Sequence, residues 1–346
     1  MSKIKQELGL ARLIYQSDKP FPARGSSRRR TPRVMLYQNQ ERAPGLMTHV
    51  ARVLCFSEYA ERHGFQLVVD LKSYYNNLLE KDLVGKVNAW EYYYEQPFAG
   101  APDLESLLQS GDYYTTPISR KYLLSRDRRV RGSRFAQALL RLKKTDFINP
   151  SVQNCLANRE DYLRCCRACQ KYIRFNEKTA QYLEAEYQKL LAGKRVVGVS
   201  IRGTDYSVKK TYGHPIQPEI GNVIGMVRDC MEKNAYQYIY LSCEEHKAVD
   251  LFEAAFPGHV IINQRQFFDS VDFTKSSTGI WAVKFDREND AYLKGLEYLS
   301  SMNLLARCDA LIGGINTGSQ MAYIMNNDKY EFVYFYNLGL YGIDDK

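Results

Sequence analysis

The sequence predicts an α/β fold whose second half is a doubly wound parallel sheet. Between residues 195 and 336, five short apolar runs alternate with helical patterns. A strand–helix–strand pattern also opens the first half, over residues 34–70. This alternation is typical of parallel sheets that are covered by helices. The chain has 346 residues, which is enough for two domains.

The first half is expected to form an N-terminal α/β domain over residues 34–158, preceded by a basic arm at 1–33. Apolar positions with helical spacing run up to Gly64, a residue type that commonly ends helices. The expected elements are a strand at 34–37, a helix at 45–64, a strand at 65–70 and short helices near 102–110.

The second half is more regular. A long helical stretch at 159–193 is expected to connect the two domains, and the C-terminal domain is expected to span 194–346. Its expected strands lie at 195–201, 236–242, 259–263, 309–313 and 331–336, and its helices at 219–233, 246–256, 290–307 and 318–326.

The excess positive charge lies in the front half of the chain. Residues 1–150 hold 25 lysines and arginines against 15 acids, whereas the remainder holds 23 against 24. The stretch 120–144 is especially basic, which favours anionic partners such as phosphates, acidic glycans or anionic membrane surfaces, or is simply a solvated face. We expect no membrane span and no secretory leader, and the scattered cysteines favour a reducing, cytoplasmic location without a zinc site.

Catalytic and ligand-binding residues are expected in the loops that follow the carboxyl ends of the C-terminal strands, because doubly wound sheets bind ligands there. The first such loop, IRGTDY at 201–206, places Arg202 directly after a buried strand. An arginine there fits a phosphate bidentately, although a surface pair with Asp205 is the simpler interpretation.

Two further loops follow the same logic. SCEEH at 242–246 offers Glu244 and Glu245, which either contact a nucleotide or begin a helix as favourable acids. GGINTGSQ at 313–320 begins a helix. The exposed N–H groups of this helix either form an anion-binding site or are capped by side chains of the same segment. The sequence lacks the motifs of P-loop proteins, dinucleotide dehydrogenases, serine hydrolases and zinc proteases.

These segments, in this order, resemble the GDP-fucose-dependent fucosyltransferases, above all the branch of α1,6- and nodulation fucosyltransferases. The family's first motif, G-x-H-x-R-R-T-D followed by H-P-I, is similar to GVSIRGTDY at 198–206 and to His214-Pro215-Ile216. Its second and third motifs are similar to YLSCEE at 240–245 and LLARCDALIGGINTGSQ at 304–320. The segments 42–70 and 74–98 are similar to the family's N-terminal part.

The resemblance implies a GT-B-like architecture, with two Rossmann-like domains facing each other across a cleft. It also implies inverting, metal-independent transfer of fucose from GDP-fucose to a glycan or lipid-linked glycan, with no cofactor and no metal ligand. Arg202 and Asp205 would be catalytic. The donor would be bound by Arg202, Ser200, Gly203, His214, Glu244, Glu245, Asn316, Thr317, Gly318 and Ser319.

The sequence also departs from the family pattern. The motif histidine is Ser200, the second arginine is Gly203, and the position of the family's base is Lys210. A lysine is a poor base unless strongly desolvated, so Asp70 and Glu219 are further candidates on the acceptor side. The alternatives are another nucleotide sugar on the same fold, or a non-catalytic protein that binds glycans or, less expectedly, nucleic acid.

Overall fold

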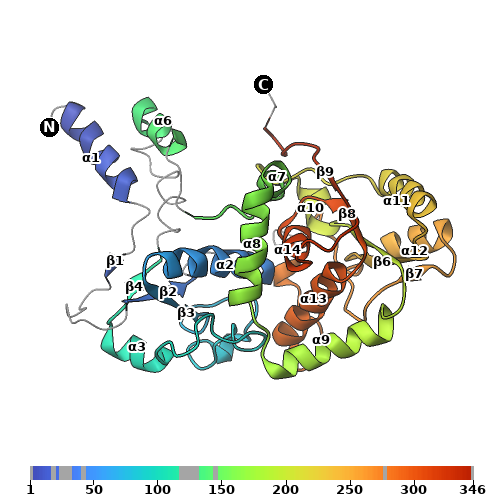
Figure 1. The fold of residues 1–346 in the computed structure, drawn as a ribbon, viewed down its shortest axis with the longest axis horizontal. Coiled ribbons are helices and arrows are strands. Elements are labelled where there is room, and N and C mark those ends of the chain that lie inside the picture. The colour runs from blue at the N-terminus through green and yellow to red at the C-terminus, as the bar shows by residue number, and fades with distance from the viewer. Residues whose placement is uncertain are drawn as a thin grey trace.

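The computed structural model is an α/β protein with two sheets of mainly parallel strands (Figure 1). It describes residues 3–16, 21–22, 33–39, 44–116, 132–142, 147–275 and 279–343. The strand order is β1-β4-β2-β3 in the first sheet and β7-β6-β5-β8-β9 in the second. The α/β class predicted from the sequence is confirmed.

The N-terminal sheet is centred on two parallel strands. β2 (Arg33–Gln38) pairs with β3 (Phe65–Asp70) along its whole length, and α2 (Leu46–Arg62) connects them. On the other side of β2 lies the short parallel strand β4 (Tyr114–Thr115), to which β1 (Phe21–Pro22) adds an antiparallel edge. This sheet is therefore smaller than a full doubly wound sheet.

The C-terminal sheet has the predicted doubly wound order, and all of its strand pairs are parallel. The strand at 259–263 is shorter than expected, whereas the others lie where the sequence predicts them. The strands are β5 (Val196–Ser200), β6 (Tyr238–Ser242), β7 (Val260–Ile261), β8 (Ala310–Gly314) and β9 (Phe332–Tyr336). The helices after the connector are α10 (Thr204–Lys209), α11 (Ile220–Asn234), α12 (His246–Ala255), η2 (Ile280–Ala282), α13 (Asp290–Ala306) and α14 (Thr317–Met325).

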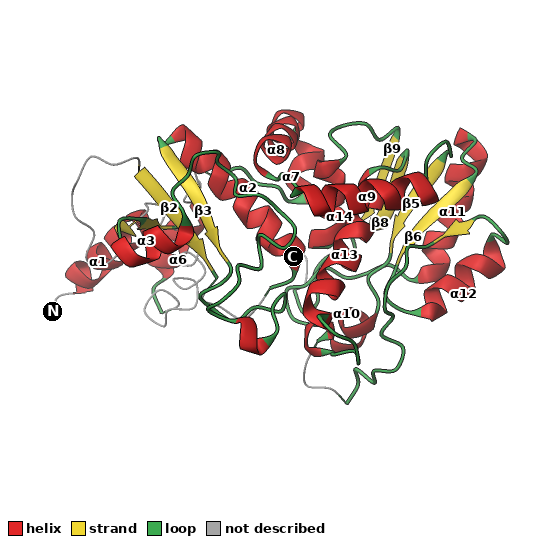
Figure 2. Ribbon diagram, turned by 90° about the horizontal axis from the view of Figure 1, so that it is seen from below, coloured by secondary structure: helices red, strands yellow, loops and turns green. Residues whose placement is uncertain are grey.

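The strands bury both faces, with side chains alternating between two apolar layers. Val197 and Val199 of β5 face the layer beneath α11 and α12, whereas Val196 joins the layer that contains α13 and α14. This second layer also includes side chains of α2 from the N-terminal half, so one core runs through both halves. Figure 2 shows α2, α8 (Arg159–Tyr172), α13 and α14 lying between the two sheets.

The connector predicted as one helix over 159–193 is two helices, α8 and α9 (Glu177–Leu190), preceded by the short α7 (Val152–Ala157). The break has a tertiary cause. Arg174 accepts a backbone hydrogen bond from Glu95 at 2.9 Å, and Phe175 forms a bridge with Tyr94. Asn176 then caps α9 by accepting the Thr179 N–H at 2.9 Å.

The segment predicted as a basic arm at 1–33 contains a helix, α1 (Lys3–Gln16), instead of extending freely over its whole length. α1 packs against α6 (Arg134–Leu142), and Ser133 donates a hydrogen bond of 2.6 Å to Glu7. Leu10 and Ile14 are buried, which explains why this basic segment folds at all. The basic stretch 120–144 lies outside the described residues except for 132–142.

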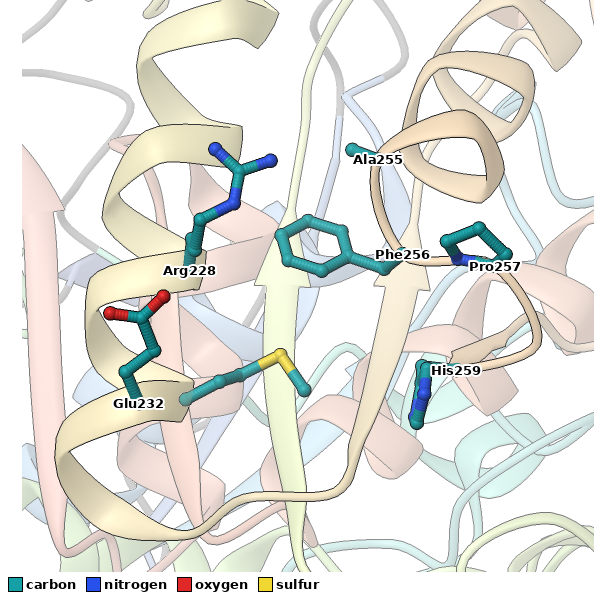
Figure 3. A pocket seen from close by; sticks show the side chains of 7 residues that line it. Arg228, Glu232, Ala255, Phe256, Pro257 and His259 are labelled. Carbon is teal, nitrogen blue, oxygen red and sulfur yellow. The ribbon is translucent and has the colours of Figure 1, made fainter.

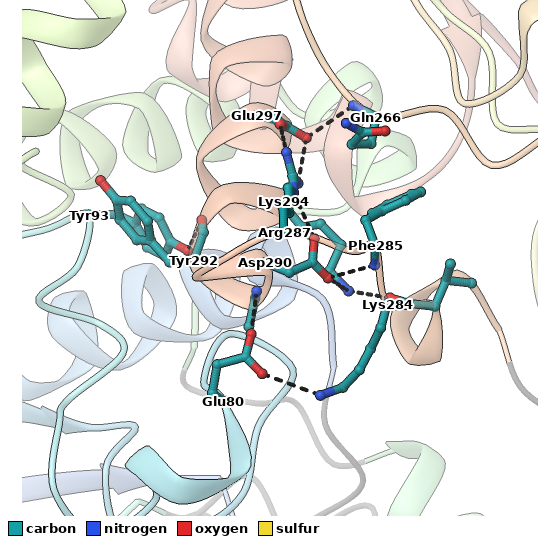
Figure 4. Close-up of polar contacts among 12 residues, drawn as sticks. Glu80, Tyr93, Gln266, Lys284, Phe285, Arg287, Asp290, Tyr292, Lys294 and Glu297 are labelled. Atoms are coloured by element: carbon teal, nitrogen blue, oxygen red, sulfur yellow. Dashed lines mark hydrogen bonds and ion pairs between the residues drawn. The ribbon is translucent and has the colours of Figure 1, made fainter.

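The two halves also meet through polar contacts at the start of α13 (Figure 4). Glu80, next to η1 (Lys81–Leu83), accepts the Ala291 N–H at 2.9 Å and lies 3.3 Å from the Lys284 ammonium. It therefore caps α13 from the opposite half. Tyr93 stacks on Tyr292 with ring centroids 5.6 Å apart and donates to its carbonyl at 2.8 Å.

Asp290 holds together the segment 285–294 beside this junction, and replacing it is expected to destabilise the protein. Its buried carboxylate contacts Arg287 at 2.8 Å and Lys294 at 3.2 Å, and accepts the Phe285 N–H at 3.1 Å. Asp290→Asn removes the charge but keeps the volume, so we expect a loss of about 1–2 kcal/mol in urea unfolding. The matched control, Asp272→Asn, removes an exposed carboxylate near Lys275 and should change nothing measurable. Equal stability of Asp290→Asn and the wild type would contradict this role.

His49 of α2 is expected to make the fold sensitive to acid. It is fully buried beside the Tyr37 hydroxyl, 3.0 Å from Nδ1, and burial together with the Arg52 charge lowers its pKa to about 3. A lowered pKa means that the neutral ring stabilises the fold above about pH 6.5 and that this stability is lost as the pH falls. The free energy of unfolding of the wild type should fall between pH 6.5 and pH 5, and His49→Gln should remove about 2 kcal/mol of that fall. Parallel stability profiles of the two proteins would disprove the assignment.

No helix among the described residues combines the length and apolarity that a membrane crossing needs. No group of three or more histidine, cysteine or carboxylate side chains in these ranges is arranged to hold a metal ion.

Candidate active site

The three loops that the sequence singled out meet at one edge of the C-terminal sheet. Ser200, the last residue of β5, is in register with Ser242 of β6 on one side and with Gly313 of β8 on the other. Because these strands are parallel, the segments that follow them leave the sheet side by side. The structure therefore brings together the predicted loops at 201–206, 242–246 and 313–320.

Arg202 is held in place where β5, the central strand, ends. Its guanidinium forms an ion pair with Glu244 and lies 4.8 Å from the ring centroid of Tyr206. Its side chain is 18% exposed and that of Glu244 6%, so one side of the arginine is still accessible. Glu244, predicted to lie near a nucleotide, is thus the residue that orients Arg202.

Thr204 completes this group from a strained position. Its φ of 49° lies in the left-handed region, which costs a β-branched residue about 1–2 kcal/mol. Thr204 is buried, and its hydroxyl donates to Glu244 Oε2 at 2.7 Å. Strain held by a specific contact is common at functional sites. The side chain of Asp205 lies outside the described part of the structure.

Gly203 and Glu245 lie against each other. A Cβ atom placed at Gly203 would lie 2.7 Å from Glu245 Oε2. A side chain at position 203 would therefore have to displace this carboxylate. Because that oxygen is the far end of a flexible side chain, the displacement would cost little, and Glu245 lies over the loop backbone.

The loop at 313–320 forms the N-terminus of α14. Asn316 accepts the Ser319 N–H at 3.0 Å, and Ser319 Oγ accepts the Asn316 N–H at 3.2 Å. Ser319 is fully buried, and its hydroxyl also donates to the Gly314 carbonyl at 2.8 Å. These two side chains therefore build the helix cap. Within the described residues, no hydrogen-bond partner is found for the N–H groups of Thr317 and Gly318, which suits an anion.

His214 joins the group through Tyr206. The two rings are 4.9 Å apart, and His214 Nδ1 is buried with no hydrogen-bond partner in the described part of the chain. Two backbone hydrogen bonds of 2.9 Å tie this loop to Tyr341: the Gly213 N–H donates to the Tyr341 carbonyl, and the Tyr341 N–H donates to the His214 carbonyl. The C-terminal segment thus fixes the position of the histidine.

The three candidates for the acceptor side have different surroundings. Asp70 ends β3 of the other sheet and already accepts hydrogen bonds from Gln38 and from the backbone N–H groups of Lys72 and Ser73. Lys210 is an exposed left-handed residue that ends α10, and Glu219 is an exposed residue that precedes α11. Ser200 is buried within the sheet.

Three residues at this edge were missed by the sequence analysis. Tyr206 lies under Arg202, and Gln217 donates to the Ile315 carbonyl at 3.0 Å. Tyr298 of α13 is the third: a Cβ atom placed at Gly318 would lie 2.5 Å from its hydroxyl. Tyr206 stands inside the quoted motif, but no local pattern marks the other two, because tertiary contacts alone bring them here.

A hollow of about 480 Å³ lies elsewhere on this domain (Figure 3). Its lining includes Arg228, Phe256 and His259. His259 precedes β7, so the hollow lies toward the amino ends of the strands, opposite to the loops described above. Doubly wound sheets bind ligands at the other edge.

Comparisons with known proteins identify the fold. No protein-family model and no curated protein matches the sequence. Among solved structures, the NodZ α-1,6-fucosyltransferase soaked with GDP-fucose is 15% identical over 90% of this chain and 98% of its own, with a TM-score of 0.51. NodZ from Bradyrhizobium in selenomethionine form is 14% identical over 90% and 97%, with a TM-score of 0.49. POFUT1 in its apo form is 9% identical over 90% and 100%, with a TM-score of 0.44. The chain therefore has the fold of the NodZ α-1,6-fucosyltransferase.

Proposed function

We propose that this protein is an inverting glycosyltransferase that moves fucose from GDP-fucose to a glycan acceptor without a metal ion. One observation carries the proposal: Arg202, aligned by Glu244 and Tyr206, follows the central strand at the same edge of the sheet as the loop that begins α14. The similar NodZ structure was soaked with GDP-fucose, which supports this choice of donor.

The chemistry follows from where charge develops. In an inverting transfer, an acceptor hydroxyl attacks the anomeric carbon from the side opposite to the diphosphate. The carbon–oxygen bond then breaks, and its electron pair stays on the phosphate oxygen. Arg202 and the N–H groups of Thr317 and Gly318 would stabilise that charge, which is the role a metal plays in other transferases. We propose Asp205 as a further catalytic residue.

The proton of the acceptor hydroxyl needs a base. A lysine is a poor general base outside a strongly desolvated site, and Lys210 is exposed, so it is poorly suited. Asp70 is buried, and both of its carboxylate oxygens already accept hydrogen bonds from the protein, so neither is open to an acceptor hydroxyl. Glu219 is exposed and is our preferred candidate. Glu219→Gln should lower turnover with little change in GDP affinity.

Thermal-shift measurements with GDP, UDP, CMP and their sugars test the donor. At 100 times Kd a ligand stabilises its protein by about 2.7 kcal/mol, so we expect GDP and GDP-fucose alone to raise Tm, and equally in EDTA. Stabilisation by UDP or CMP instead would favour another sugar donor on the same fold. No effect of any nucleotide, together with binding of heparin or RNA, would favour the non-catalytic alternative.

We further propose a cytoplasmic protein that acts in surface polysaccharide or glycoconjugate synthesis and touches anionic membranes through residues 120–144. In the described part of this stretch, Arg134 and Phe135 are exposed, a pairing of cation and apolar ring that suits a membrane surface. Sedimentation with phosphatidylserine vesicles at physiological salt tests this contact. Protein that stays in the supernatant would contradict it.

A further inference from the structure

A second arginine, Arg265, lies at the same edge of the sheet, in the segment that follows β7. Its Nη1 lies 3.4 Å from the Ser301 hydroxyl oxygen. Its Nε is buried and has no hydrogen-bond partner, and no ion pair joins Arg265 to a carboxylate, among the residues that the structure describes. Burying a guanidinium without a carboxylate partner costs folding free energy. The cost indicates that the anion of a ligand pairs with Arg265.

The segment that carries Arg265 is fixed at both ends. Asn263 accepts hydrogen bonds from the Tyr240 hydroxyl at 2.8 Å and from the Ser301 hydroxyl at 2.9 Å. At the other end, the Phe268 N–H donates to the Glu244 carbonyl at 2.9 Å. The second contact links the segment directly to the residue that orients Arg202. Arg265 therefore has little freedom to move away from this edge.

Tyr298 connects the two arginines to the start of α14. It lies one turn before Ser301 on α13, and its hydroxyl is next to Gly318. Burial raises the pKa of Tyr298, and the positive charges of Arg202 and Arg265 oppose that rise. Both guanidiniums are therefore close enough to act on one hydroxyl group.

We propose that Arg265 is a second diphosphate-binding residue, which adds positive charge to this edge of the sheet from the segment after β7. This inference rests on the proposed function. A GDP-sugar brings a diphosphate to this edge, and the site then offers two guanidiniums and a helix N-terminus to one anion. Arg202 alone would leave much of that charge unbalanced.

Calorimetric titration with GDP, inorganic pyrophosphate and guanosine tests the assignment. Arg265→Gln should weaken GDP and pyrophosphate binding by about 10- to 100-fold and leave guanosine unchanged. Arg265→Lys, which keeps the charge but not the planar fork, should recover part of the loss. Arg228→Gln is the matched control, because this exposed arginine lies over Phe256 at the opposite edge.

The outcomes separate the two claims. The assignment of Arg265 would be overturned if Arg265→Gln bound GDP and pyrophosphate with wild-type affinity. It would also be overturned if the affinity for guanosine fell as much as the affinity for GDP. If the wild type binds pyrophosphate but not GDP, the proposed function fails, and the effect of Arg265→Gln on pyrophosphate still decides the inference. Binding of neither phosphate by the folded wild type would overturn both. If Arg265→Gln does not fold, Arg265→Lys must show the weaker phosphate binding at unchanged Tm.

Discussion

Arg202→Ala is expected to lower kcat/KM for transfer from GDP-fucose by about 10²- to 10³-fold, the usual effect of removing one group that stabilises developing charge. Arg202 follows the central strand, at the same edge of the sheet as the loop that begins α14. The substitution removes its charge from the departing diphosphate, so kcat should fall more than KM rises.

The alanine variant has a second consequence that must be measured separately. Glu244 is nearly buried, and without Arg202 its charge has no cationic partner of that strength, so the fold should also lose stability. Arg202→Lys keeps a positive charge next to Glu244 but loses the planar fork. We expect it to retain Tm and still lose about tenfold in kcat/KM.

A matched control lies at the opposite end of the same strand. Arg195 precedes β5 and pairs with Glu331 on the surface, 2.6 Å from its carboxylate. Arg195→Ala should leave transfer unchanged. If Arg195→Ala and Arg202→Ala lost the same transfer activity, the effect of Arg202 would not depend on its position at the carboxyl edge of the sheet. Full activity of Arg202→Ala would remove Arg202 from the mechanism.

Gly313→Ala is expected to destabilise the protein by about 3 kcal/mol, at the upper end of the cost of overpacking. A Cβ atom at Gly313 would lie 2.6 Å from the Ser200 carbonyl oxygen. That oxygen belongs to the backbone of the neighbouring strand and cannot rotate away. β5 and β8 must separate at the end that carries Arg202, so nucleotide binding should weaken as well.

Gly221→Ala is the control for this substitution. Gly221 lies in the first turn of α11, and a Cβ atom there meets nothing within 4 Å. Its stability should be unchanged or slightly raised, because alanine is the better helix former. Urea unfolding of both variants checks the contrast. Two equally stable variants would show that β5 and β8 tolerate a methyl group between them.

The sequence predicts the C-terminal domain well because strands and helices alternate there with clear apolar periods. The strand ends predicted at residues 201, 242 and 313 lie within one residue of the observed ends at Ser200, Ser242 and Gly314. The meeting of the loops that follow these strands was predicted as well. The break between α8 and α9 could not be predicted in the same way. It depends on contacts of Arg174 and Phe175 with residues about eighty positions earlier.

The candidate site, like the fold, could be predicted from the sequence only in part. Arg202 and the start of α14 follow from their places at strand and helix ends. The structure adds two contacts that the sequence did not predict: Glu244 pairs with Arg202 across two loops, and Ser319 is buried in the helix cap. Tyr298 and Arg265 were missed, since each reaches the edge of the sheet through contacts with distant parts of the chain.

A structure of the complex with GDP tests the central claim most directly. The account predicts the β-phosphate within hydrogen-bond distance of the Arg202 guanidinium and of the Thr317 or Gly318 N–H group. A diphosphate bound elsewhere, with Arg202 turned away from it, would contradict the account.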